Sequence, residues 1–436
     1  MIKKSKNIEI ITLGCSKNLV DSEQFHFYLQ ENGHNVKHNQ NFDTADIAIV
    51  NTCGFINDAK EESIEVIFNL IHKKNEGKLD KIIVFGCLSE RYMRELKQEL
   101  PEVDSILGNF DIKALISEIG IKNIESPAIK RVLDNPGHYA YLKIAEGCNR
   151  KCAFCAIPSF KGKYISRSID SILHEANYLA TNGVKELMLI AQDTSFYGYD
   201  LEKKYLLSTL LDELVKTKGI EWIRVHYLYP NALTQNLIDT IAKHDKICSY
   251  FDLPLQHISN DILKRMKRNT SKEKIEKLIE RIRKTIPNAG LRTSFIVGFP
   301  GETKRDFNEL INFIKQTRFD RLGAFIYSHE ENTYGGKNLV DDISKRTKQN
   351  RLEKLMEVQQ NISLEINAEK ISQTMPVIID GVENDVFYGR TQHDSVEVDN
   401  TVWVDYDADI EIRNIYDIKI YDSAEFDLFG EIAKKI

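Results

Sequence analysis

The sequence predicts an α/β protein made of three successive parts, and two changes of pattern along its 436 residues support this. Short apolar runs alternate with amphipathic stretches up to about residue 125, and the alternation resumes after a proline-containing stretch, 126–137, that is typical of a linker. Strands that alternate with helices favour parallel sheets. Beyond about residue 370, apolar and polar residues alternate singly, which is typical of a small antiparallel β-barrel. The expected domains are 5–125, 134–367 and 368–436.

The first part contains four short apolar runs separated by helical patterns. The expected strands are 8–15, 35–38, 47–53 and 81–87. The expected helices are 18–33, about 58–75 and a segment that begins at Ser89. This alternation favours a flavodoxin-like parallel sheet with the strand order 2-1-3-4.

The central part predicts six further strands, each followed by a helical or loop segment. These strands are 139–148, 186–193, 222–228, 249–256, 291–300 and 321–328. Six such units form an open, partial (βα)6 barrel, whose chemistry is expected at the carboxyl ends of the strands. A charged helical segment at 341–371 carries Leu352, Leu355, Val358 and Ile362 on one face, so it is expected to pack on the barrel.

The last part predicts an OB-like barrel, because its apolar residues alternate with polar ones between turn residues. The alternating segments are 377–392, 395–399, 401–415 and 418–432. From Glu369 onward the chain has sixteen acidic against six basic residues, although the whole chain carries only −6.

The chain gives no sign of a membrane segment or a secretion signal. No apolar run reaches the roughly 20 residues of a membrane span, and the amino terminus has no apolar stretch followed by a small-residue cleavage site. A cytoplasmic location is therefore expected, where thiols stay reduced.

Three of the seven cysteines are closely spaced: Cys148, Cys152 and Cys155 form C-x3-C-x2-C directly after a predicted strand. Three thiolates can hold three irons of a 4Fe–4S cluster and leave the fourth iron open to another ligand. Zinc is the alternative, but structural zinc prefers four ligands and no His lies in the loop. A disulfide conflicts with the reducing compartment.

Three other cysteines, Cys15, Cys53 and Cys87, are far apart in sequence but each ends a predicted strand. In the expected strand order these strands are neighbours about 4.8 Å apart, so the thiols meet at the carboxyl edge of the sheet. A second, auxiliary 4Fe–4S cluster is predicted here, with buried structural thiols as the alternative. Cys248 is expected to be a core thiol.

The cysteine loop at the start of a partial barrel resembles the radical S-adenosylmethionine (SAM) superfamily. Together with the three earlier cysteines and the terminal barrel, the chain resembles the methylthiotransferases, whose last domain is TRAM-like. Several stretches resemble the branch that modifies an aspartate of ribosomal protein uS12, rather than the branch that modifies adenosine in tRNA. They are LGCSKNLVDSE (13–23), IPSFKGKYISRSI (157–169), AQDTSFYGYDL (191–201), DLPLQHISNDILKRM (252–266) and GRTQHDSVEVDN (389–400).

The resemblance implies two 4Fe–4S clusters and SAM as cofactors. The cluster on Cys148, Cys152 and Cys155 binds SAM and cleaves it reductively to a 5′-deoxyadenosyl radical. The auxiliary cluster holds the sulfur, which a second SAM methylates. The radical removes hydrogen from the β-carbon of an aspartate of uS12, and the methylthio group is transferred there. The implied partners are uS12, free or in the small subunit, and proteins that donate sulfur and electrons.

The resemblance also implies residues that contact SAM: Phe154, Gln192, Asp193, Gly298 and Gly301. No catalytic residue beyond the cluster ligands is predicted. Two departures from the family pattern are Asn269, where Gly is usual, and the segment 329–336, which lacks the usual Gly-Thr-Pro-Ala.

Four further residues are weaker candidates for the site. His257 and Arg292 lie at or near predicted strand ends, and Lys161 and Lys163 follow the cysteine loop. Because lysines are mostly solvated, surface charge is the expected role of the last two.

The acidic terminal part bears on the partner. A barrel that holds tRNA should be basic, because neutralising phosphates dominates affinity for RNA. Direct binding of tRNA is therefore not expected, and a basic ribosomal protein is the better match.

Overall fold

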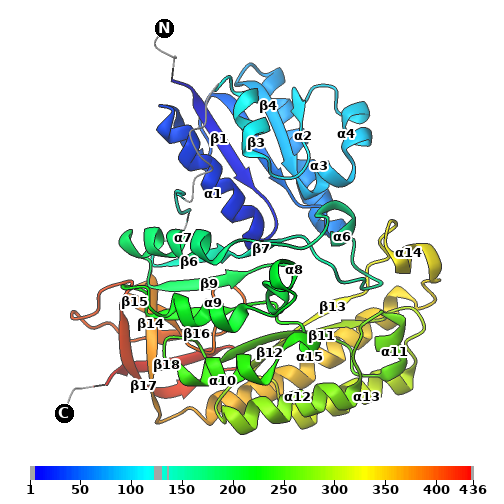
Figure 1. The fold of residues 1–436 in the computed structure, drawn as a ribbon, viewed down its shortest axis with the longest axis vertical. Helices are drawn as coiled ribbons and strands as arrows, with labels where there is room; N and C mark the ends of the chain where they lie inside the picture. Colours follow the sequence, from blue (N-terminus) through cyan, green and yellow to red (C-terminus); the bar gives the residue numbers. More distant parts are fainter. Residues whose placement is uncertain (1–4, 122–129, 135–136, 434–436) are drawn as a thin grey trace. The chain divides into compact units, whose positions relative to one another are not determined.

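The computed structural model describes residues 5–121, 130–134 and 137–433, and the chain divides into two compact units. The first unit comprises Met1–Gly137, Tyr141–Arg150 and Cys155–Tyr178. The second comprises His138–Ala140, Lys151–Phe154 and Leu179–Ile436. Figure 1 shows the elements of each unit, coloured along the sequence from blue at the amino terminus to red at the carboxyl terminus.

The first unit is built on a five-stranded parallel sheet in the order β2-β1-β3-β4-β5. This confirms the expected order 2-1-3-4 and adds a short edge strand. The strands are β1 (Asn7–Thr12), β2 (Asn35–His38), β3 (Ala45–Thr52), β4 (Leu79–Gly86) and β5 (Ser105–Ile106). The helices that alternate with them are α1 (Ser16–Glu31), α2 (Asn57–Asn75), α3 (Cys87–Arg91), α4 (Met93–Glu99) and α5 (Ile112–Glu118).

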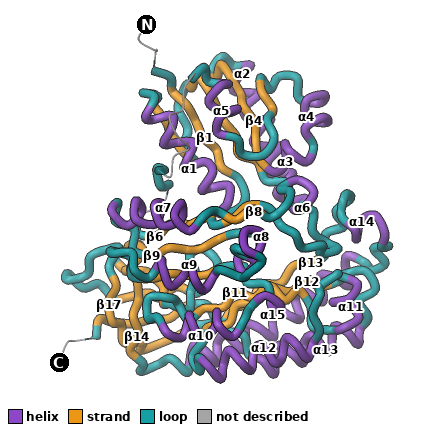
Figure 2. Tube along the Cα trace, viewed as in Figure 1, coloured by secondary structure: helices purple, strands orange, loops and turns teal. Residues whose placement is uncertain are grey.

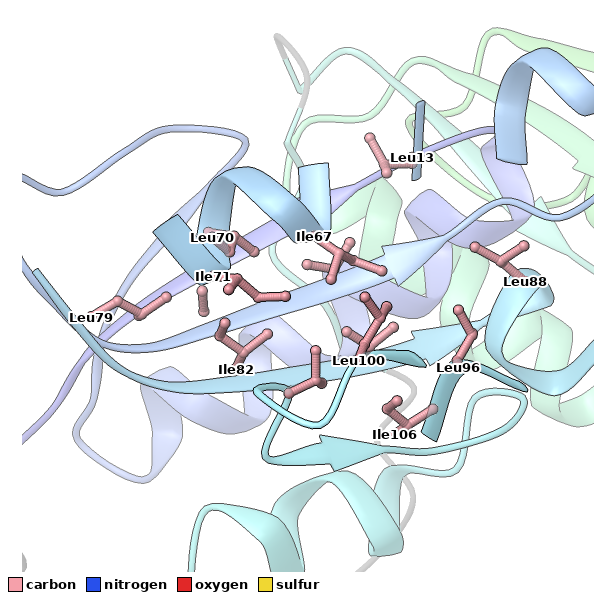
Figure 3. Close-up of a cluster of buried hydrophobic side chains, with 14 of the residues drawn as sticks. Leu13, Ile67, Leu70, Ile71, Leu79, Ile82, Leu88, Leu96, Leu100 and Ile106 are labelled. Atoms are coloured by element: carbon pink, nitrogen blue, oxygen red, sulfur yellow. The ribbon is translucent and has the colours of Figure 1, made fainter. Parts of the chain in front are cut away.

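Helices cover both faces of this sheet because its central strands are apolar on both sides. On one face, Ala48 and Val50 of β3 pack with α2 and α4, where Figure 3 shows Ile67, Leu70 and Leu96 around the strands. On the other face, β3 packs with α1 and α5 through the residues that alternate with these. The sheet is therefore held from both sides, which orders its strand ends.

Part of the predicted linker packs on α1. Residues 122–129 and 135–136 lie outside the described residues. Arg131 is buried and forms an ion pair of 3.0 Å with Glu23. The backbone N–H of Val132 also donates to the carbonyl of Glu23, at 3.1 Å. This described piece of the linker is therefore anchored on the first unit.

The remaining short elements of the first unit follow the linker. They are β7 (Ala145–Glu146), α6 (Ile157–Phe160), β8 (Ile165–Ser166) and most of α7 (Ile169–Thr181). Strand β7 pairs with β8 in an antiparallel ladder.

The second unit contains the six expected strands of the central part. They are β6 (Tyr139–Lys143, of which the first two residues belong here), β9 (Glu186–Ile190), β10 (Trp222–Val225), β11 (Tyr250–Gln256), β12 (Gly290–Val297) and β13 (Arg321–Ile326). They form two three-stranded sheets, β6-β9-β10 and β11-β12-β13, and a parallel bridge joins Ile223 of β10 to Ile247, just before β11. The structure thus has the expected open, partial barrel.

Helices line the outside of this barrel, as Figure 2 shows for the lower row of purple helices. The longer ones are α9 (Leu207–Leu214), α10 (Gln235–Lys243), α12 (Lys272–Thr285), α13 (Lys304–Thr317) and α15 (Lys345–Ala368). Shorter helical elements are η1 (Thr194–Phe196), α8 (Tyr199–Glu202), η2 (Pro230–Ala232), α11 (Asn260–Arg265) and α14 (Tyr334–Asn338). Helix α15 contacts β13 and α13 and buries Leu355, Val358 and Ile362, so the expected packing of this segment is confirmed.

The last part of the chain closes into a barrel in the order β14-β15-β16-β18-β17. Its strands are β14 (Thr374–Glu383), β15 (Val386–Thr391), β16 (Thr401–Val404), β17 (Ile415–Ser423) and β18 (Asp427–Ile432). Most neighbours are antiparallel, as expected, but β16 and β18 are parallel. The barrel is therefore mixed rather than purely antiparallel.

The segment 395–399 was expected to be a strand, and this expectation is wrong. Its side chains instead bond to the central part: Ser395 Oγ lies 3.1 Å from His226 Nε2, and Asp399 accepts a 2.7 Å hydrogen bond from the Tyr250 hydroxyl. The alternation of polar and apolar residues here reflects a docking loop, which resembles a strand in its pattern.

No helix in the described ranges is long and apolar enough to span a membrane.

Candidate metal centres and cofactor site

Cys15, Cys53 and Cys87 follow the carboxyl ends of three adjacent strands of the first unit. Cys15 precedes the first residue of α1, Cys53 follows β3, and Cys87 is the first residue of α3. None is itself the last strand residue, because each chain turns at the sheet edge before or at the cysteine. The three thiols lie close together: besides burial, the neighbouring Cys15 raises the pKa of the Cys53 thiol, and Cys15 and Cys53 raise that of Cys87.

Glycine lets the backbone come close to these thiols. Gly14 has a φ of +89°, and a Cβ on it would lie 2.7 Å from both Cβ and Sγ of Cys53. Gly86 has a φ of +111°, and its Cβ would lie 2.6 Å from Asn51 Oδ1. L-residues with side chains rarely adopt such angles, so the turns at two of the three strand ends depend on glycine.

Asn18 connects the strand ends through its side chain. Its Nδ2 donates to the carbonyls of Leu13 and Thr52, at 2.9 and 3.1 Å. Its Oδ1 accepts from the thiol of Cys87 at 3.8 Å. One buried amide of α1 therefore holds the loops after β1 and β3 and contacts a predicted ligand.

The electrostatic environment of the thiols is mixed. The pKa of the Cys87 thiol is raised to about 12, chiefly by burial and less by the thiols of Cys15 and Cys53, while the ammonium of Lys161 lowers it. Burial works against the charge of Lys161, but Cys87, Glu146 and Asp21 raise the pKa of Lys161. Lys161 is therefore a half-buried charge close to a predicted ligand, rather than the solvated charge that was expected, whereas Lys163 is exposed. Iron binding would have to displace the Cys87 proton.

The loop of the C-x3-C-x2-C motif belongs to both units: Cys148 and Cys155 are in the first, and Cys152 is in the second. The backbone N–H of Cys148 donates to the carbonyl of Gly162 at 3.1 Å. The backbone N–H of Arg150 donates to Cys148 Sγ at 3.4 Å.

Cys87 and the residue after Cys155 share a buried cluster within the first unit. Ala156, next to Cys155, is buried in this cluster with Cys87 and Phe160. A ligand of one predicted cluster thus packs on the immediate neighbour of a ligand of the other. Sequence reasoning predicted both triads but not this contact.

Within the second unit, Arg268 contacts Cys152: its Nη1 lies 3.6 Å from Cys152 Sγ. Nothing in the local sequence marked Arg268 as a contact of this loop. Phe154 packs against buried residues that include Ala153, Phe299 and Tyr327. Its position beside a ligand is consistent with the expected role near SAM.

Several predicted residues lie just beyond the carboxyl ends of barrel strands. Gln192 follows β9, and its Oε1 is buried with no hydrogen-bond partner among the described residues. Asp193 accepts a 2.6 Å hydrogen bond from Ser195 Oγ, which orders the loop. His257 follows β11, is fully buried, and accepts from Ser259 N–H on Nδ1 at 3.0 Å.

This hydrogen bond fixes the tautomer of His257. Because Nδ1 accepts, Nε2 carries the proton, and it has no acceptor in the described part of the chain. Burial lowers the pKa of His257 to about 3, so the ring is neutral near pH 7. Gln192 and His257 therefore each present one unsatisfied polar atom, which suits a polar ligand at this barrel edge.

Gly298 and Gly301 follow β12 and have φ values of +72° and +80°. A Cβ on Gly298 would lie 2.4 Å from Lys348 Cγ, and one on Gly301 would lie 2.3 Å from Arg265 Nη1. The close approach of α15 and α11 thus accounts for both glycines. Glu302, which sequence reasoning missed, holds this turn by accepting from the N–H groups of Gly298 and Phe299.

Arg292 lies near the amino-terminal end of its strand, away from the carboxyl ends where the cofactor site is expected. It is the third residue of β12 and pairs with Asp252 and Asp399 at 3.1 and 3.2 Å. Its role is to join the central part to the terminal barrel.

The donor sets fit iron–sulfur clusters by their chemistry, since each consists of three cysteine thiols outside any disulfide and no imidazole. In the described residues, no three His, Cys, Asp or Glu side chains lie close enough together to bind a single metal ion as they stand.

Comparison with known proteins adds the family. Residues 142–314 match the radical SAM superfamily, 7–108 match the uncharacterized protein family UPF0004, and 371–433 match the TRAM domain. A ribosomal protein uS12 methylthiotransferase RimO of Bacteroides fragilis is 50% identical over 430 residues, which are 98% of this chain and 100% of that protein. The chain belongs to the RimO family of methylthiotransferases. Its radical SAM membership implies a 4Fe–4S cluster and SAM.

Other RimO relatives are nearly as similar. Those of Parabacteroides distasonis and Flavobacterium psychrophilum are each 47% identical, over 99% of this chain and 100% and 99% of the relatives. These relatives are named for uS12, so the tRNA branch is not favoured.

Solved structures share the RimO-family fold at low identity. The radical SAM methyltransferase TsrM of Kitasatospora setae superposes with a TM-score of 0.56 at 12% identity, over 94% of this chain and 84% of its own. The cobalamin-dependent SAM radical enzyme OxsB gives 0.51 at 15% identity, over 82% and 56%. The α/β architecture is thus confirmed.

Proposed function

We propose that this chain attaches a methylthio group to the β-carbon of an aspartate of ribosomal protein uS12. The observation that carries the proposal is the presence of two cysteine triads in a member of the RimO family, with Cys87 of one triad packed on Ala156, the neighbour of Cys155 of the other. Methylthio transfer needs a site that makes a radical and a site that holds sulfur, both within reach of one carbon atom.

In this proposal Cys148, Cys152 and Cys155 hold the SAM-binding 4Fe–4S cluster, and Cys15, Cys53 and Cys87 hold an auxiliary 4Fe–4S cluster. When bound, these groups supply the radical and the methylated sulfur. Asn18 and Gly14 order the auxiliary ligands, and Lys161 stabilises negative charge beside Cys87.

Five residues are proposed to contact SAM at the edge of the barrel. Gln192 would satisfy its buried Oε1 there, and Asp193 orders the loop around it. Phe154 packs beside the cysteine loop, and Gly298 and Gly301 lie in the turn that follows β12 at this edge. Each contact is inferred from position.

We also propose that the three parts act as domains with the bounds 5–125, 134–367 and 368–436. The terminal barrel would bind basic uS12 through exposed acidic side chains, chiefly Asp405, Asp409 and Glu411. Not all the acidic excess is available for this, because Asp380 pairs with Arg390 and Asp394 pairs with Arg321. Proteins that donate sulfur and electrons complete the set of partners, and the site of action is the cytoplasm.

Mass spectrometry of uS12 tests the proposal. In cells that lack this gene, uS12 is expected to lose the mass of one methylthio group. An unchanged uS12 mass together with loss of a methylthio-adenosine from tRNA would contradict the choice of substrate.

Iron analysis tests the clusters separately from the substrate. The anaerobically purified protein should contain about eight irons, and about four after Cys148, Cys152 and Cys155 are replaced by Ala. The Cys248→Ala variant is the matched control, because this buried thiol belongs to neither triad and should leave the iron content unchanged. Retention of all iron in the triple variant would refute the assignment.

Docking on the terminal barrel is tested by salt and charge. Binding to uS12 should weaken with added salt. It should also weaken when Lys replaces Asp405, Asp407, Asp409 and Glu411. Indifference to both changes would remove the acidic surface from the proposal.

A further inference from the structure

The guanidinium of Arg268 contacts one predicted cluster ligand directly. Its Nη1 donates to Cys152 Sγ at 3.6 Å, and its Nη2 donates to the carbonyl of Pro254 at 2.5 Å. The side chain is 7% exposed, so its charge is poorly screened by water. Arg268 is 116 residues from Cys152 in sequence, and the contact depends on the folded second unit.

The surroundings hold this guanidinium in one orientation. It stacks on the ring of Tyr229, 4.1 Å from the ring centroid. Backbone hydrogen bonds also fix the segment that carries Arg268. Arg268 N–H donates to the carbonyl of Leu263 at 2.9 Å, and the carbonyl of Met266 accepts from Ala153 N–H at 2.8 Å. The end of α11 and the cysteine loop are thus joined by main-chain and side-chain hydrogen bonds.

We propose that Arg268 is a positioning residue that raises the reduction potential of the cluster on Cys148, Cys152 and Cys155. This inference rests on the proposed function, since it assumes that the cluster binds there. Reduction adds one electron, supplied by a low-potential one-electron reductant, and makes the cluster more negative. A positive charge and an N–H···S hydrogen bond at a ligand sulfur both stabilise the reduced state.

The geometry distinguishes arginine from lysine at this position. The planar fork bonds Cys152 and Pro254 at once while its face stacks on Tyr229. An ammonium group keeps the charge but cannot make all three contacts. Arg268→Lys should therefore retain part of the effect, and Arg268→Gln should lose the charge entirely.

The test is a redox titration of the full chain with dithionite, followed by electron paramagnetic resonance. Cys15, Cys53 and Cys87 are replaced by Ala in the parent, so that a single cluster contributes. At a fixed potential, Arg268→Gln is expected to lower the ratio of reduced to oxidised cluster about tenfold, equivalent to about 59 mV for one electron. Arg268→Lys should give a smaller decrease.

Lys264→Gln is the matched control, because this lysine is exposed on α11, the helix that precedes Arg268. It should leave the ratio unchanged. Equal ratios for Arg268→Gln and Lys264→Gln would overturn the inference. If Arg268→Gln does not assemble a cluster, the Arg268→Lys variant provides the test. A ratio of reduced to oxidised cluster below that of the parent, but by less than tenfold, supports the inference. A ratio equal to that of the parent overturns it. Absence of iron from the parent itself would instead refute the proposed function, and the inference with it.

Discussion

At the scale of single residues, the auxiliary triad depends on neighbours that are not ligands. Gly14 leaves room for Cys53, and Asn18 bonds the carbonyls of Leu13 and Thr52, the residues that precede Gly14 and Cys53. Neither residue type is reactive, so each matters through the position it imposes on a thiol. Their effects should appear in iron content before they appear in the chemistry.

Replacing Gly14 by Ala tests the first of these roles. The added Cβ would lie 2.7 Å from Cys53 Sγ, and the φ of +89° is strained for alanine. We expect iron to fall from about eight to about four per chain, because only the auxiliary site is disturbed. Iron and sulfide analysis after anaerobic reconstitution measures this.

Gly77→Ala is the control for Gly14→Ala. Gly77 also has a positive φ, +71°, but a Cβ there would meet nothing within 4 Å. It bears the same backbone cost of about 1 kcal/mol without the clash. Equal iron in the two variants would show that the space beside Cys53 is unimportant.

Replacing Asn18 by Ala tests the second role. The carbonyls of Leu13 and Thr52 would lose their side-chain donor, which should lower the free energy of unfolding by about 1–3 kcal/mol and reduce auxiliary iron. Asn32→Ala is a suitable comparison, because Asn32 makes the same kind of side-chain bond to a carbonyl, that of Tyr28, far from the thiols. Normal iron in Asn18→Ala would contradict an ordering role.

At the scale of elements, α15 is the helix whose packing was predicted from its apolar stripe. Its Leu355 is fully buried, and Leu364 on the same helix is 41% exposed. The helix contacts β13, the last strand of the partial barrel, and Lys348 lies against Gly298. The end of the barrel is thus stabilised by a helix that follows it in sequence.

Leu355→Ala should lower the free energy of unfolding by about 2–5 kcal/mol, because it leaves a cavity between α15 and the barrel. Leu364→Ala should change it by less than about 0.5 kcal/mol. Denaturant unfolding followed by circular dichroism provides both values. A similar loss in the two variants would mean that helix propensity, and not packing, accounts for the effect.

At the scale of the whole molecule, the terminal barrel and the central part form one unit through buried ion pairs. Arg321 of β13 binds Asp394, which is fully buried, and Arg292 of β12 binds Asp399. Asp394 and Asp399 of the terminal part therefore neutralise arginines of the central, partial barrel. The local charge of this part overstates the charge on its surface.

Asp394→Asn should reduce stability by about 3–5 kcal/mol, because it leaves Arg321 buried without its counter-charge. Burial opposes ionisation, but Arg321 and Lys370 hold the pKa of Asp394 well below its usual range. In the wild type, the ionised Asp394 therefore contributes its full stabilisation above about pH 4, and this stabilisation is lost as the pH falls further. Acid titration of Tm should show a steeper loss in the wild type than in Asp394→Asn.

The exposed Asp409→Asn is the control for charge alone. It should shift Tm little at any pH. Equal acid sensitivity of wild type and Asp394→Asn would show that the buried pair does not link the two parts.

The amino-acid sequence by itself determined the strands, most helices and both cysteine triads. The spacing of apolar residues along the chain predicts which residues are buried in a strand or helix. Parallel strands place their carboxyl ends at one edge of a sheet, so the proximity of Cys15, Cys53 and Cys87 could be predicted from the sequence. The loop 395–399 was misjudged because a docking loop and an edge strand share the same alternation.

Only the tertiary structure decided the contacts between distant residues. That Lys161 lies close to Cys87, that Arg268 bonds Cys152, and that Arg292 pairs with Asp399 depends on the path of the chain. Composition treats such residues as solvated charges, since most charged side chains are. Their partners are chosen by packing across more than seventy residues of chain, and no local pattern records that choice.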